Sequence, residues 1–189
     1  MSFSLAVLAP TFSDDLGPRW STELARHGLL VEFYPGFKPS TWRGGFLPFM
    51  VKVQSGAFPT AARYGSDPLL GGFELDFGRT DAEELAEVAA EEQVPAVAAL
   101  LESCRVEAVL STSMGRTVLD LRLQSFAAAT LAIVARGLVM DGQQGKSFVG
   151  AEAVANAARE SDLFDAQPIH EADWDLVPFP GWQALEPAG

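Results

Sequence analysis

One polar loop combines residue types that could bind an anion. The loop runs Ser111-Thr-Ser-Met-Gly-Arg-Thr117 and precedes a helix expected from Val118. The first turn of a helix offers backbone N–H groups without partners, and Arg116 adds a positive charge, so this loop could hold a carboxylate or a phosphate. The alternative is ordinary capping of the helix by Ser113 or a neighbour, which requires no ligand.

A second loop carries residue types that are common in binding interfaces. It runs Phe37-Lys-Pro-Ser-Thr-Trp-Arg-Gly-Gly45 and contains Trp42 and Arg43. Trp and Arg are among the side chains most often found as anchors of protein interfaces. The alternative places Trp42 beneath its own loop, with the stem of the arginine lying over the ring.

The common signatures of nucleotide binding and hydrolysis are missing. Gly145-Lys146-Ser147 is half of a phosphate-binding loop, but the glycine that this motif requires five positions earlier is Met140. No Gly-x-Ser-x-Gly stretch is present, and Ser113 has no local base. The catalytic residues are therefore unknown, and the sequence favours a protein that is not an enzyme.

Metal binding and paired-acid chemistry are also weakly supported. Of the two histidines, His27 lies near a helix end, where a cationic form suits the helix dipole, and His170 lies among acidic residues without a regular ligand spacing. Glu74 and Asp76 stand two apart on an expected strand and point outward as surface acids. We therefore expect no metal and no cofactor.

The charge of the chain is strongly negative and unevenly distributed. The net charge is -12, and residues 71–112 carry ten acidic against two basic groups, while residues 161–189 carry six and none. This balance argues against nucleic acid and against an anionic membrane surface. An acidic helix face with Glu84, Glu87 and Glu91 could instead attract a basic protein, and the alternative is a face that serves only solubility.

The elements that would position these residues follow from apolar periodicity. Alternation predicts strands at 3–8, 46–53 and 73–77, with further strands at 29–34, 106–110, 138–140 and 147–149. Helices are expected at 18–27, from 80 to 104 with a break at Pro95, at 118–136 and at 151–159. The predicted fold class is α+β, a mixed or mostly antiparallel sheet of about six to seven strands with about four helices, one of them central and Ala-rich.

Several local features sharpen this prediction. Pro48 inside its strand indicates an edge position or a bulge. Residues 55–72 are expected to form a long loop with one helical turn, of a length that is often functional. Thr80 begins a capping box with Glu83, and Gly137 is expected to cap the Ala-rich helix.

The chain is expected to form one domain in the cytoplasm. Residues 1–189 make up the domain, with 161–189 as an extended acidic tail packed on its surface. The apolar start has no basic residue before it, so it indicates a strand and not a signal peptide, and no uninterrupted apolar run has the length of a membrane span. Cys104 stands alone on an apolar helix face, which predicts core packing and fits a reducing compartment.

One segment resembles a known group of proteins. After the Ala-rich helix the chain continues Gly137-Leu-Val-Met-Asp141-Gly-Gln143. This stretch resembles a "Gly-x-Val-x-Asp-x-Gln" pattern of small bacterial proteins, some of which are similar to immunity proteins of polymorphic or contact-delivered toxins. Gly142 stands where that pattern more often has proline. The resemblance implies a stoichiometric binder with no catalytic residues.

Two functional hypotheses follow. The first is a non-enzymatic binding protein, such as an immunity protein that sequesters a bacterial toxin domain, with Trp42, Arg43, Glu84, Glu87, Glu91 and Arg116 as candidate contact residues. The second is a small-molecule enzyme or sensor with a pocket formed by the 55–72 loop, Trp42 and Arg116. A flat acidic face over a solid core favours the first, and polar residues converging on a deep pocket favour the second.

Overall fold

The computed structural model describes residues 3–112, 116–167 and 171–185, which form an antiparallel sheet with five α-helices. The strands are β1 (Phe3–Ala9), β2 (Leu29–Phe33), β3 (Phe46–Val53), β4 (Leu69–Arg79), β5 (Val106–Thr112), β6 (Leu138–Asp141), β7 (Lys146–Val149) and β8 (Val177–Pro178). The helices are α1 (Leu16–Ala25), α2 (Ala82–Glu91), α3 (Pro95–Ser103), α4 (Val118–Ala135) and α5 (Ala151–Ala166), with short 3₁₀ turns at Ala61–Tyr64, Glu171–Trp174 and Trp182–Leu185. The predicted α+β class is confirmed, with slightly more strands and helices than expected.

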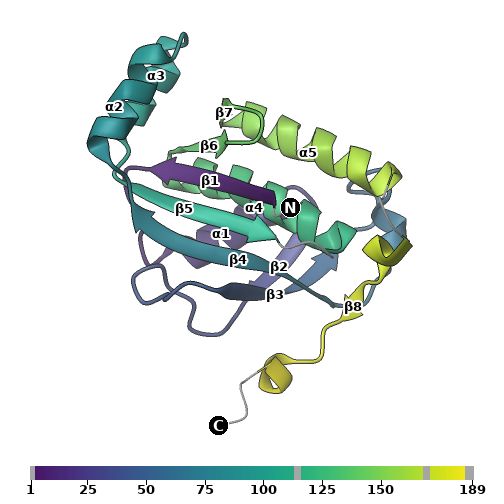
Figure 1. Cartoon of the computed structure of the whole chain (residues 1–189). Coiled ribbons are helices and arrows are strands. Elements are labelled where there is room, and N and C mark those ends of the chain that lie inside the picture. The colour runs from purple at the N-terminus through teal and green to yellow at the C-terminus, as the bar shows by residue number, and fades with distance from the viewer. Residues whose placement is uncertain (1–2, 113–115, 168–170, 186–189) are drawn as a thin grey trace.

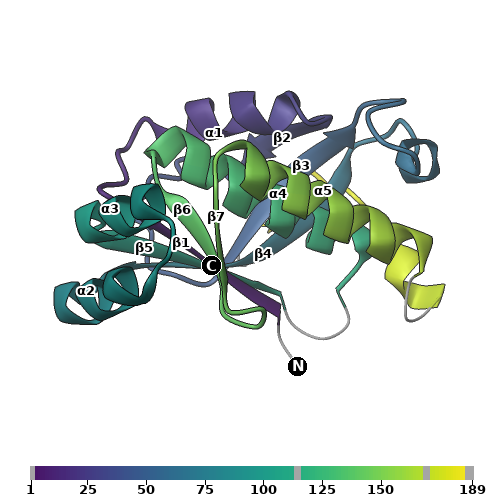
Figure 2. The ribbon, with the colours of Figure 1, turned by 90° about the horizontal axis from the view of Figure 1, so that it is seen from above.

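The two faces of this sheet are covered unequally. The strand order is β2-β3-β4-β5-β1-β6-β7, and β8 pairs with β4 beside this path. Helices α1, α4 and α5 pack over one face (Figure 2), whereas α2 and α3 lie on the other face and only at one end, against β1 and β6 (Figure 1). No other helix of the described residues covers that second face.

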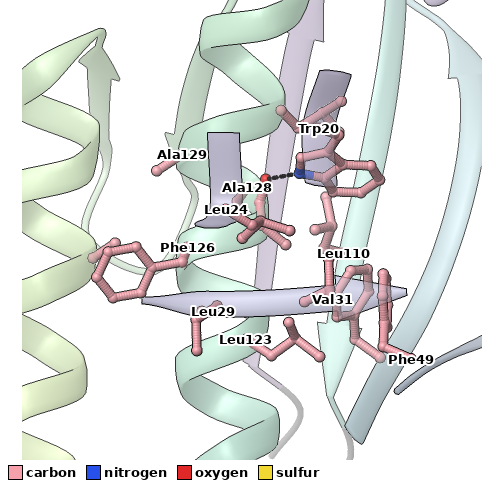
Figure 3. Packing of buried hydrophobic residues seen from close by; sticks show 14 of the residues in the cluster. Trp20, Leu24, Leu29, Val31, Phe49, Leu110, Leu123, Phe126, Ala128 and Ala129 are labelled. Atoms are coloured by element: carbon pink, nitrogen blue, oxygen red, sulfur yellow. Dashed lines mark hydrogen bonds between the residues drawn. The ribbon is translucent and has the colours of Figure 1, made fainter. Parts of the chain in front are cut away.

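Helix α4 fills the centre of the covered face. Thr117 accepts a hydrogen bond from the Asp120 N–H while the Asp120 carboxylate accepts from the Thr117 N–H, so these two residues close its N-terminus. Ser113, the expected cap, lies outside the described residues. Across the helix, the indole of Trp20 donates to the Ala127 carbonyl at 3.0 Å and packs beside Leu24 (Figure 3).

The length and composition of α4 would also allow it to cross a membrane. Its mean hydropathy over 18 residues is 1.5, but 78% of this window is buried inside the protein. It packs on the sheet and on α1 and α5. This is the environment of a core helix.

Two expectations about the strands are wrong. Strand β4 begins at Leu69, so the expected 55–72 loop ends earlier. Gly72 lies within the strand, and a glycine is needed there because a Cβ would stand 2.7 Å from the Leu47 carbonyl oxygen. Pro48 lies in β3, which is interior and not an edge. Strand β2 pairs with β3 only as far as Phe33, which lies opposite Phe49. The nitrogen of Pro48 points to the β2 side just beyond this last pair, so its missing N–H costs no hydrogen bond between the strands.

Expected helix ends also shift. Asp81, not Thr80, caps α2 by accepting from the N–H groups of the first helical turn. Helix α4 ends with Arg136 in the left-handed conformation, φ 55°, and not with Gly137. A glycine is needed at 137 for another reason, because a Cβ there would lie 2.0 Å from the Leu8 carbonyl oxygen.

The extended tail expected from residue 161 is wrong at its start. Helix α5 continues to Ala166, because Ser161 and Asp165 face the interior and are buried. Residues 171–185 then run along the molecule: Trp174 packs against Tyr64 with ring centroids 5.2 Å apart, and β8 pairs with the start of β4.

Candidate functional site

The uncovered part of the second sheet face is the first candidate, and we call it the open face. The register orders its side chains in two rows, Phe46, Glu74, Ser111 and Ser4 in the first and Asp76, Val109, Ala6 and Met140 in the second. Glu74, Asp76 and Phe46 are exposed, and Phe46 is one of the few large apolar side chains that are. Carboxylates on β4 thus border a strip of small and apolar side chains.

A cavity of about 440 Å³ occupies the end of the open face nearest α2. Ser4 and Ala6 of β1 line it, and their short side chains leave the space open. Leu85 and Val88 of α2 and Met140 of β6 contribute apolar walls. The volume lies within the range of about 300–1,000 Å³ that is usual for small-molecule sites, and the cavity could equally receive a side chain of a protein partner.

The charged residues that line this cavity are mostly acidic. Asp81 and Glu84 come from the first turn of α2, Glu107 comes from β5, and Arg79 ends β4. Three carboxylates therefore face one guanidinium around an otherwise apolar space. Such a site attracts a cationic group that also carries apolar surface.

Helix α2 places the three glutamates that were expected to meet a partner. The Asp81 side chain accepts from the N–H groups of Glu83 and Glu84, which fixes where the helix begins. Glu84 lines the cavity, whereas Glu87 and Glu91 are exposed on the same helix and do not line it. The structure therefore brings one of the three to the site and leaves the other two on the adjoining surface.

Trp42 and Arg43 lie at the border of the open face, beside β4. The indole N–H of Trp42 donates to the Leu75 carbonyl at 2.8 Å, and the Leu75 N–H donates to the Gly45 carbonyl at 2.9 Å, so this loop continues the pairing of β3 with β4. Trp42 is half-buried and Arg43 is exposed. The indole therefore holds its own loop in place, and Arg43 presents its side chain to solvent.

Arg116 lies beyond the C-terminal end of β5. Its Nη1 donates to Thr112 at 3.2 Å, and it lines a cavity of about 150 Å³ together with Glu74 and Asp120. Burial lowers the pKa of Arg116, and the carboxylates of Asp173 and Asp120 act against that shift. The guanidinium thus already has acidic neighbours.

This arrangement gives no support to the expected anion site or to the shared pocket. The N-terminus of α4 is closed by Thr117 and Asp120, and residues 113–115 of the expected loop lie outside the described residues. Trp42 does not line the cavity of Arg116, and Gly72 is the one residue of 55–72 that does. The structure therefore separates the two residues that the sequence had grouped.

A buried ionic cluster between α4 and α5 was not predicted from the sequence. Nη2 of Arg122 donates to Asp162 at 2.6 Å and to Asp165 at 2.7 Å. Asp165 also accepts from the Tyr64 hydroxyl at 2.9 Å and from Thr60 at 2.5 Å. Burial and the neighbouring Asp165 carboxylate raise the pKa of Tyr64, so its hydroxyl stays protonated and can donate.

A signal for this cluster does exist in the sequence. Arg122 is the one charged residue between positions 121 and 135 of an otherwise apolar helix. A buried charge requires a counter-charge, and acids three apart on one helix, such as Asp162 and Asp165, share a face. The partner was missed because the final helix was expected to end at residue 159.

His27 lies close to this cluster, at the end of α1. It is half-buried, and burial lowers its pKa while the nearby Glu23 acts against this shift. Burial therefore favours the neutral ring, against the cationic form that would suit the end of a helix. Within the described part of the chain, no group of three His, Cys, Asp or Glu side chains could hold a metal, and His170 lies outside it.

Comparison with protein-family models, with characterised proteins and with solved structures finds no match. The resemblance of residues 137–143 to immunity proteins therefore stays a prediction. In the structure this segment forms β6 and the turn to β7, where buried Asp141 accepts from the N–H groups of Gln143 and Gln144 at 2.9 and 3.1 Å. The aspartate of the pattern thus has a structural role in shaping the turn.

Proposed function

We propose that the protein is a non-enzymatic binding protein whose open face and helix α2 engage a basic protein partner. The observation that carries this proposal is the 440 Å³ cavity in an uncovered sheet face, with apolar walls and three carboxylates against one guanidinium. An apolar centre with a polar rim is the composition of protein interfaces. The sign of the charge selects a partner that presents Lys or Arg side chains.

The surface around the cavity supports the same partner. Glu74 and Asp76 on β4 and Glu87 and Glu91 on α2 are all exposed. Their combined field accelerates encounter with a basic surface and repels nucleic acid and anionic lipid. The exposed ring of Phe46, 51% accessible, offers an apolar contact at the far end of the same face.

The resemblance to immunity proteins suggests which kind of basic protein the partner is. The partner is then a basic toxin domain of a bacterium, and the protein blocks it by stoichiometric binding in the cytoplasm. Blocking requires no catalytic residue on the protein, and an acidic surface that covers a basic active-site cleft provides both affinity and specificity.

Binding to a defined partner tests the proposal. The proposal expects a basic toxin domain encoded next to the gene of this protein. Binding to that domain is measured at about 50 and 300 mM NaCl, because screening weakens interactions between charged surfaces. Glu74→Lys changes the charge on the open face, and Glu152→Lys makes the same change on exposed α5, which packs on the covered side. We expect the first variant to bind about tenfold more weakly and the second to bind like the native protein.

Two results would overturn the proposal. If the two proteins bind at neither salt concentration, the toxin domain is not the partner. If the two charge variants bind with equal affinity, the open face is not the interface, even though the proteins bind.

A further inference from the structure

A second cavity, of about 370 Å³, lies on the covered side of the molecule. It opens between the end of α1, the segment after β3, and helices α4 and α5, and Arg26, His27, Phe58, Arg122 and Asp162 line it. It shares no lining residue with the cavity of the open face. Any ligand here is therefore independent of the proposed protein interface.

The guanidinium of Arg122 is incompletely bonded. Its side chain is 1% exposed, and Nη2 alone serves both Asp162 and Asp165. Nε and Nη1 are buried without an acceptor among the residues that the structure describes. Buried donors of a charged group are normally all paired, because an unpaired one loses its hydration without compensation.

His27 presents a second unpaired atom on the same cavity. Its Nε2 is buried and makes no hydrogen bond within the described residues, and the Glu23 carboxylate lies 3.9 Å away, beyond hydrogen-bonding distance. The ring rests against Phe126 with centroids 5.6 Å apart, which fixes its position. The neutral ring can carry its proton on Nε2, which is then a donor without an acceptor.

We infer that this cavity binds a small organic carboxylate with an apolar body. The two carboxylate oxygens would accept from the unpaired N–H groups of Arg122 and from Nε2 of His27 after a small turn of these side chains toward the cavity, because the three nitrogens are closed off from it in the free protein. The pairing suits the planar guanidinium. The apolar body would lie against Phe58, whose ring centroid is 3.6 Å from the guanidinium carbon of Arg122, and against Phe126 and Val154.

The charges around the cavity set the class of ligand. Arg122 already faces the carboxylates of Asp162 and Asp165, and Arg26 at the rim pairs with Glu23 at 2.6 Å. These acids oppose a ligand with two negative charges. A monoanion keeps the hydrogen bonds of a carboxylate at the smallest electrostatic cost.

The test uses benzoate as the probe, with benzamide as its neutral isostere and inorganic phosphate as an anion without an apolar body. Each is titrated into the native protein while the imidazole signal of His27 is followed by NMR, and the His27→Leu variant identifies that signal. We expect saturable binding of benzoate, with binding at least about tenfold weaker for benzamide and for phosphate.

Two variants place the binding in the cavity. Ala158→Phe on α5 fills it, whereas Ala155→Phe puts the same ring on the exposed side of the same helix. Benzoate binding, measured by calorimetry, should be lost in the first and kept in the second. No saturable binding of benzoate, equal binding of benzamide, tighter binding of phosphate, or unchanged binding to Ala158→Phe would each overturn the inference.

Discussion

Removal of the Asp165 carboxylate should strongly destabilise the protein, and far more than removal of the Asp162 carboxylate. Asp165 is fully buried and accepts hydrogen bonds from Arg122, Tyr64 and Thr60. Asp165→Ala leaves the buried guanidinium with Asp162, whose side chain is 40% exposed. Two hydroxyl groups also lose their acceptor.

The magnitude follows from the cost of removing the buried partner of a buried charge, which keeps only the partly exposed Asp162. Removing one partner of a buried ion pair costs about 3–5 kcal/mol of unfolding free energy. With a urea slope of about 2 kcal/mol per M, a loss of about 4 kcal/mol lowers the unfolding midpoint by about 2 M. Asp162→Ala is the matched control and should cost about 1 kcal/mol or less, because exposed ion pairs contribute little.

A double variant separates charge from packing. Arg122→Met combined with Asp165→Leu removes both charges and keeps apolar volume, so it should be more stable than Asp165→Ala alone by about 2 kcal/mol. Urea unfolding followed by tryptophan fluorescence measures all three. A midpoint for Asp165→Ala within about 0.5 M of the native value, or a double variant less stable than the single one, would refute the assignment of the cluster as a buried ionic core.

Three further outcomes are expected. Gly137→Ala should cost about 1–3 kcal/mol in the same urea assay, because its Cβ would lie 2.0 Å from the Leu8 carbonyl oxygen, whereas Gly142→Ala, with no atom near its Cβ, should be neutral. Burial lowers the pKa of His27, so protons bind more readily to the unfolded chain and unfolding free energy should fall as pH drops below about 6.5, less steeply in His27→Leu. Burial raises the pKa of Cys104, so its reaction with a thiol reagent should be slow and should follow unfolding; fast labelling of the native protein would contradict this.

The sheet could be predicted where one strand face is buried. Alternating apolar residues located β1, β3 and the centre of β4, because every second residue there is buried and the residue between is less so. The buried pairs are Leu5 and Val7 in β1, Leu47 and Phe49 in β3, and Phe73 and Leu75 in β4. The start of β4 was missed, since Gly71 and Gly72 are typical of loops and their place in the strand depends on close contacts with other elements. Such contacts are tertiary and leave no periodic signal.

The grouping of residues into candidate sites was harder to predict from the sequence than the strands were. Glu84 was identified from the acidic helix, but its neighbour Glu107 comes from β5, and only the fold shows that both line one cavity. Trp42 and Arg116 were grouped as unusual residue types, although each makes contacts within its own neighbourhood. The sequence indicates which residues are chemically notable, whereas their grouping depends on strand order.

The fold also changes where the acidic surface lies. Of the acidic groups after residue 160, Asp162 and Asp165 pair with Arg122, and Asp173 is buried. These acids stabilise the interior and contribute little field at the surface, so the tail is a weaker candidate for contact with a basic partner than its composition indicates. The exposed carboxylates of α2 and β4 have no such internal partners among the ion pairs of the described residues. A basic partner that approaches the molecule therefore meets its strongest attraction at the open face, where the apolar cavity also lies.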